Sequence, residues 1–113
     1  MLFLVDMPMR FEGEVLADKI VIHINPEVLD LVPGYINNRK NDLPVIKQYL
    51  ENNAFEEIRT MGHKMKGGGN LYGLEQVTLM GDKIEKAAIA LDKKPIEEAL
   101  AVLEDYLNRV EVV

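Results

Sequence analysis

The chain has 113 residues, 48% of them hydrophobic, with a formal net charge of −6 at pH 7 and an isoelectric point of about 4.9. This length and composition suit a single domain with one core. The lack of cysteine excludes disulfides, thiolate metal sites and thiol nucleophiles, and the acidic surface argues against general binding to nucleic acid or anionic membranes.

Residues 1–25 differ in pattern from the rest and are predicted to be an N-terminal extension, partly strand. The chain starts with MLFLVDM, which is apolar but has no basic leader and is interrupted by Asp6. A signal peptide or a membrane span needs a longer uncharged run. We therefore expect a cytoplasmic protein.

Two short segments near the ends of the chain have a strand pattern. Residues 19–24, KIVIHI, alternate so that Ile20, Ile22 and Ile24 share one face. Residues 110–113, VEVV, are also rich in β-formers. A small β element formed by the N- and C-terminal segments is therefore a further expectation.

Residues 26–113 are predicted to form one domain, a helical bundle. Asn25 is a good helix cap and Pro26 fits the first helical position. Pro33–Gly34 and Pro44 interrupt the apolar stripe, so we expect a short N-terminal helix followed by a longer, bent one. The stripe consists of Leu29, Val32, Ile36, Leu43, Ile46 and Leu50.

Three more helices are predicted, beginning near Ala54, at Leu74 and at Pro95. Their core-facing residues are predicted to be Ala54, Ile58, Met61, Met65, Gly68 and Tyr72 in the first, Leu74, Val77, Gly81, Ile84, Ala88 and Leu91 in the second, and Ile96, Ala99, Leu100, Leu103, Leu107 and Val110 in the third. Four helices with short connections predict an all-α fold, an antiparallel up-down four-helix bundle.

His63 falls opposite the core-facing stripe of its helix, with Arg59, Lys66, Gly67 and Asn70 around it. A lone surface histidine usually has no special role, and the GGG run could simply end the helix. The core-facing stripe nevertheless continues past Gly67 to Tyr72, and the outer stripe around His63 continues to Asn70, so the helix is expected to continue. A glycine inside a helix costs roughly 0.5–1 kcal/mol of stability relative to alanine. Bare backbone beside a histidine therefore favours a surface where a partner docks or an anion fits.

The chemistry of His63 and Lys66 suits phosphoryl transfer. A neutral imidazole offers an unprotonated nitrogen that can attack phosphorus. Lys66, one turn further on, is placed to neutralise the phosphoryl oxygens. His23, in the strand pattern, has no partner in the sequence and is predicted to be a structural or surface residue.

The segment GHKMKGGGNLYG, followed by LMGDKIEKAA, resembles the histidine-containing phosphotransfer (HPt) domain of multi-step two-component phosphorelays. The resemblance covers about residues 26–110. Gly68–Gly69 keeps the small size that the family pattern has there but departs in residue type, because the family more often has serine or alanine. The residues that match the family pattern are His63, Lys66, Gly67, Gly68, Gly73, Gly81 and Glu85.

The resemblance implies roles for four of the matching residues, among which Gly67 would keep the approach open for an incoming receiver domain. His63 would accept the phosphoryl group through Nε2, Lys66 would stabilise its oxygens, and Glu85 would hydrogen-bond Nδ1. From spacing alone, Glu85 could equally be a solvated partner for surface charges. The implied partner-binding surface consists of Arg59, Lys64, Gly67, Gly68 and Asn70.

The resemblance implies a phosphoryl carrier rather than a stand-alone enzyme. It would accept the group from a receiver-domain aspartate or a sensor or hybrid histidine kinase, and pass it to a response regulator. We expect this chain to bind no metal or cofactor, because Mg²⁺ is bound by the partner receiver domain. We also expect a monomer. Two alternatives stay open: a four-helix interaction module that docks receivers without being phosphorylated, and a piece of a larger hybrid or chemotaxis kinase.

Overall fold

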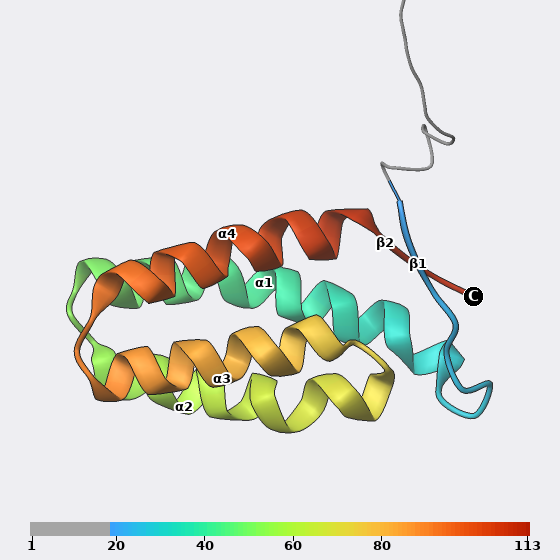
Figure 1. Cartoon of the computed structure of the whole chain (residues 1–113), viewed down its shortest axis with the longest axis horizontal. Coiled ribbons are helices and arrows are strands. Elements are labelled where there is room, and N and C mark those ends of the chain that lie inside the picture. Colours follow the sequence, from blue (N-terminus) through green and yellow to red (C-terminus); the bar gives the residue numbers. More distant parts are fainter. Residues whose placement is uncertain (1–18) are drawn as a thin grey trace, which may run out of the picture.

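The computed structural model describes residues 19–113, so the predictions for MLFLVDM and for most of the N-terminal extension lie outside the described residues. Four helices run alternately up and down the long axis of the molecule (Figure 1). They are α1 (Val32–Glu51), α2 (Phe55–Gly68), α3 (Glu75–Ile89) and α4 (Lys93–Arg109). The predicted antiparallel four-helix bundle is confirmed.

The core lies between the four helices and contains no charged side chain within the described part of the chain. Each helix contributes residues spaced three or four apart, which is the spacing that places side chains on one face of an α-helix. The largest fully buried side chains are Ile46, Ile58, Met65, Leu74, Ile84, Ile96, Leu103, Leu107, Val32 and Val77. None of the helices formed by residues 19–113 is both long enough and apolar enough to span a membrane.

The start of the bundle differs in detail from the prediction. Asn25 caps a turn rather than a helix, because its Oδ1 accepts a hydrogen bond of 2.9 Å from the backbone N–H of Glu27. The expected short helix is a single 3₁₀ turn, Leu29–Leu31 (η2), directly before α1. Pro33 lies in the first turn of α1, and Pro44 lies inside this helix without ending it.

The connection between α3 and α4 corrects two predictions. Leu91 is 67% exposed and has a positive φ of 58°, so it belongs to the loop and not to the core stripe. The last helix begins at Lys93, two residues before Pro95, with Asp92 as its N-cap. Its end also differs, because Val110 leaves the helix and enters a strand.

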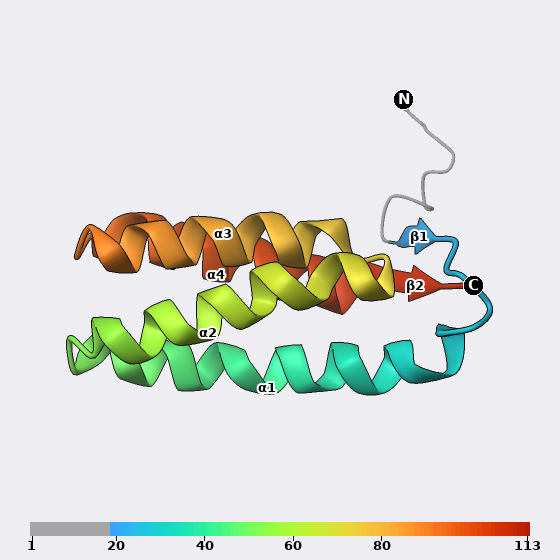
Figure 2. The same cartoon turned by 90° about the horizontal axis from the view of Figure 1, so that it is seen from below.

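The two terminal strand patterns pair as expected. Strand β1 (Ile20–Ile22) lies parallel to β2 (Val110–Val112) at one end of the bundle (Figure 2). The register pairs Ile20 with Val110 and Ile22 with Val112. Ile20 and Ile22 are half-buried and Val21 is exposed, so the predicted alternation is also confirmed.

Candidate functional site

Helices α2 and α3 approach each other so closely that their backbones touch at two glycines. A Cβ atom on Gly62 would lie 2.7 Å from the backbone nitrogen of Glu85, and one on Gly81 would lie 2.7 Å from the Cβ of Met65. Real Cβ atoms do not reach such distances, so only glycine fits at either position without a shift. Because of this contact, His63, the residue after Gly62, lies opposite Glu85 on α3.

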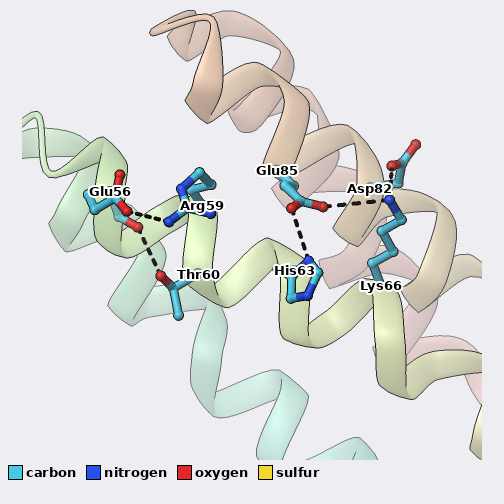
Figure 3. A network of polar contacts seen from close by, with 7 residues as sticks. All are labelled: Glu56, Arg59, Thr60, His63, Lys66, Asp82 and Glu85. Carbon is cyan, nitrogen blue, oxygen red and sulfur yellow. Dashed lines mark hydrogen bonds and ion pairs between the residues drawn. The ribbon is translucent and has the colours of Figure 1, made fainter.

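The His63 ring lies on the outer surface and contacts Glu85 through one nitrogen. Its side chain is 70% exposed, whereas that of Glu85 is only 14% exposed. The distance between His63 Nδ1 and Glu85 Oε2 is 3.0 Å (Figure 3). An ionised carboxylate can only accept, so this contact favours the tautomer with the proton on Nδ1. The other ring nitrogen, Nε2, is then left with a free lone pair.

Lys66 lies one turn along α2 from His63 and reaches across to α3. Its Nζ is 3.1 Å from Asp82 Oδ1 and 3.7 Å from Glu85 Oε1. The hydrogen bond to Asp82, together with the negative charges of Asp82 and Glu85, raises the pKa of Lys66 above its ordinary value. Lys66 therefore stays positively charged next to the histidine.

Asp82 does not stand out in the sequence, although it is the carboxylate closest to Lys66. It also pairs with Lys86, whose Nζ lies 3.0 Å from Asp82 Oδ2. Hydrogen bonds from Lys86 and Lys66 hold the pKa of Asp82 below its usual value. The spacing of Asp82 and Lys86, four residues apart on one helix, is the signal that could have shown their pairing.

The three consecutive glycines have different surroundings. Gly67 is exposed, and a Cβ there would have nothing within 4 Å. A Cβ on Gly68 would lie 2.9 Å from the hydroxyl of Tyr35, and one on Gly69 would lie 2.6 Å from the backbone nitrogen of Thr78. Packing thus explains two of the glycines and leaves Gly67 as bare backbone on the surface.

The helical path continues past Gly67, as predicted, but it tightens. Gly69–Tyr72 form a 3₁₀ helix (η3), and Gly73 follows with a left-handed φ of 77°. A left-handed backbone favours glycine because it has no Cβ to clash with the following carbonyl. Gly73 therefore lets the chain turn into α3.

The remaining predicted partner-binding residues have different surroundings. Arg59 forms an ion pair with Glu56, which raises the pKa of the guanidinium, and the charge of Glu85 adds to this shift. Lys64 is on the α1 side, where it lines a shallow hollow with Tyr49 and other residues. Asn70 is exposed on η3. Figure 3 shows Arg59 on the same helix as His63 and Lys66.

No group of three or more potential metal-ligating residues occurs in the described range 19–113. His23 is exposed and follows β1, at the strand end of the bundle. The structure therefore does not bring the two histidines together.

One comparison with known proteins gave a match. A family model described as Hpt domain matches residues 31–112, well over half of the chain. No curated protein and no solved structure matched. The matched range includes all four helices and the contacts between His63, Lys66, Asp82 and Glu85.

Proposed function

This chain belongs to the Hpt domain family, whose members carry phosphoryl groups in phosphorelays, and on that premise we propose that His63 is its phosphoacceptor. The observation that supports this most directly is the contact of 3.0 Å between His63 Nδ1 and Glu85, on a ring whose side chain is 70% exposed. It occupies one ring nitrogen and leaves the other accessible to a partner.

The donor is a phosphorylated aspartate of a receiver domain or a histidine kinase, and the acceptor is the receiver of a response regulator. Mg²⁺ is bound by the receiver and not by this chain, which acts as a carrier and not as a stand-alone enzyme. Docking is brief, because each partner must leave before the next one can reach the same histidine.

In the transfer from a receiver, the lone pair of His63 Nε2 attacks phosphorus. The N–P bond forms as the P–O bond of the aspartyl phosphate breaks, and the aspartate leaves as a carboxylate. The proton on Nδ1 stays on the ring throughout. The ring gains positive charge during the attack, and the negative charge of Glu85 stabilises it.

Lys66 stabilises the incoming phosphoryl group, and Gly67 leaves room for the receiver domain that delivers it. The charge of Lys66 neutralises the phosphoryl oxygens, which matters because phosphoryl transfer depends mainly on positioning and charge stabilisation. Gly67, one turn beyond His63, presents no side chain, so the surface of a receiver can approach the ring closely. Arg59 and Asn70 extend this contact surface along α2 and η3.

The test is an intact-mass phosphotransfer assay. Receiver domains charged with acetyl phosphate and Mg²⁺ are mixed with the wild type, with His63→Gln, and with His23→Gln as a matched control at the other histidine. We expect an acid-labile, base-stable gain of one phosphoryl mass in the wild type and the control, and none in His63→Gln. A wild type that binds receivers but never gains this mass would refute the carrier and identify an interaction module.

A further inference from the structure

We infer that Asp82 is a positioning residue that holds Lys66 while His63 is unmodified and releases it when His63 carries a phosphoryl group. The inference rests on the proposed function of His63. In this inference, Asp82 and the phosphoryl group on His63 compete for the ammonium group of Lys66. This competition keeps the phosphohistidine ready to give up its group.

The first support is the division of the carboxylate oxygens. Glu85 uses Oε2 for His63, and its other oxygen is 3.7 Å from Lys66 Nζ. Asp82 is closer to Lys66, at 3.1 Å, and both carboxylates come from α3 (Figure 3). Asp82 is therefore the group that mainly sets the position of the ammonium in the resting protein.

The second support is that Asp82 has another partner. Lys86, one turn further along α3, lies 3.0 Å from its second oxygen. If Lys66 leaves, Asp82 stays ionised and paired with Lys86. The side chains of Lys66 and Asp82 are 46% and 31% exposed, so water also compensates the departure. The contact between Lys66 and Asp82 in the resting protein is thus close, but breaking it costs little free energy.

The direction of the exchange follows from charge. A phosphoryl group has close to two negative charges and three acceptor oxygens, whereas a carboxylate has one charge and two oxygens. Lys66 therefore moves to the phosphoryl group once it is present. Part of the stabilisation gained there is offset by the lost contact with Asp82, so the phosphorylated state is less stable than it would be beside an unpaired lysine.

Asp82→Asn tests this, because it removes the competing charge and keeps the side-chain shape. Its matched control is Asp105→Asn, which removes the same charge from another pair four residues apart, that of Asp105 with Arg109 on α4 (2.8 Å). We expect the equilibrium constant for transfer from a phosphorylated receiver to His63 to rise roughly two- to fivefold in Asp82→Asn, the range of one exposed ion pair. The control should match the wild type. No rise, or a fall, in Asp82→Asn would overturn the inference.

A double mutant separates competition from a merely structural effect. In a Lys66→Met background no ammonium is left to compete for, so Asp82→Asn should leave the transfer equilibrium unchanged. If the two- to fivefold rise persists there, Asp82 acts by another route and the inference fails.

A third measurement needs no partner. Nuclear magnetic resonance titration of the Lys66 ammonium should give a lower pKa in Asp82→Asn than in the wild type, because Asp82 is the main cause of the raised value. An unchanged pKa would overturn the proposed role of Asp82 but would leave the proposed function of His63 intact. A wild type that no donor phosphorylates would instead refute the proposed function, and with it the release of Lys66.

Discussion

At the scale of single residues, the contact with Glu85 favours one tautomer of the His63 ring, and the proposed role of His63 depends on that tautomer. A free imidazole exchanges its proton between the two nitrogens, and the carboxylate 3.0 Å from Nδ1 favours one of them. The Glu85 side chain is only 14% exposed, and its two carboxylate oxygens contact His63 and Lys66 on α2. The histidine thus gains a defined tautomer while its own side chain stays exposed.

Replacing Glu85 should therefore change the tautomer of the His63 ring and leave the fold intact. In Glu85→Ala we expect the Nδ1–H tautomer to lose its preference and the phosphorylation rate of His63 to fall on the order of tenfold, the effect of losing one charged hydrogen bond. Glu85→Gln keeps an acceptor oxygen and should retain most of the rate. Nitrogen-15 chemical shifts of the ring report the tautomer, and a wild-type spectrum in Glu85→Ala would contradict its role.

A second residue-scale prediction concerns Asp42 on α1. Burial raises the pKa of its carboxyl, although Arg39, 2.8 Å away, acts in the opposite direction. A carboxyl with a raised pKa binds protons more readily in the folded than in the unfolded state. The contribution of Asp42 to the free energy of unfolding then falls as the pH rises from the usual carboxyl value, 3.8, through the raised one.

Asp42→Asn removes this titration. In urea unfolding, the stability of the wild type relative to the variant should decline as the pH rises from about 4, by no more than about 1 kcal/mol in total because the pair is partly solvated. Parallel pH curves for the two proteins would show that Asp42 does not titrate differently on folding.

At the scale of helices, the periodicity of apolar residues predicted all four helices but not how α2 packs. A helical wheel gives one core direction, and it placed Met61 and Gly68 on the core face, where both are only half-buried. Within α2 and η3 the buried glycines are Gly62 and Gly69, because these two elements also pack against α3. The 3₁₀ geometry after Gly68 adds to the error, since it turns by about 120° instead of about 100° per residue.

The helix ends were also harder to predict than the helices. The sequence predicts Pro95 as the first residue of the last helix, yet Lys93 and Lys94 precede it inside α4. Proline is tolerated throughout the first turn because those backbone N–H groups have no partner within the helix. The N-cap is Asp92, whose Oδ1 accepts a hydrogen bond from the backbone N–H of Lys94.

Two glycines of α2 should respond oppositely to the same substitution. Gly62→Ala should destabilise the protein by about 1–3 kcal/mol, because the new methyl group meets the backbone of Glu85. Gly67→Ala should leave stability unchanged or raise it by up to about 1 kcal/mol, since the methyl group meets nothing and alanine favours helix. Urea unfolding measures both free energies, and equal losses would contradict the close contact of α2 with α3.

The same position tests the exposed surface. Gly67→Leu should fold as well as Gly67→Ala but should lower the rate of transfer with receivers severalfold, because a bulky side chain blocks close approach to His63. Stopped-flow transfer kinetics of both variants give this comparison. Wild-type rates in Gly67→Leu would show that receivers do not approach over Gly67.

At the scale of the whole molecule, the candidate site depends on an arrangement that the sequence showed only in part. The resemblance to a known family is enough to assign His63, Lys66 and Glu85 to one site. Asp82 and Lys86 were missed because each, considered alone, is an ordinary surface charge. Only the distance between α2 and α3 shows that Lys66 reaches Asp82, and this distance is set by Gly62 and Gly81.

The terminal sheet joins the first and last described elements and covers one end of the bundle. The backbone N–H of Ile24 donates to the carbonyl of Val113, and that of Val113 donates to the carbonyl of Ile22, both at 3.0 Å. The side chain of Ile24 is buried, and a Cβ on Gly73 would lie 2.7 Å from its Cδ1. The segment that follows β1 thereby packs against the turn that connects η3 to α3.

This packing predicts that the strand segment supports the stability of the bundle and not the chemistry of His63. Ile24→Ala should lower the free energy of unfolding by about 2 kcal/mol, at the low end for a buried isoleucine because the site lies at the edge of the core. Val21→Ala, on the 55% exposed face of β1, is the matched control and should cost less than about 0.5 kcal/mol. Both variants should be phosphorylated to the wild-type level under conditions where they are folded, because His63 lies along α2 and makes its contact with α3. A loss of phosphorylation in folded Ile24→Ala would instead mean that the strand end and the α2–α3 site are coupled through η3.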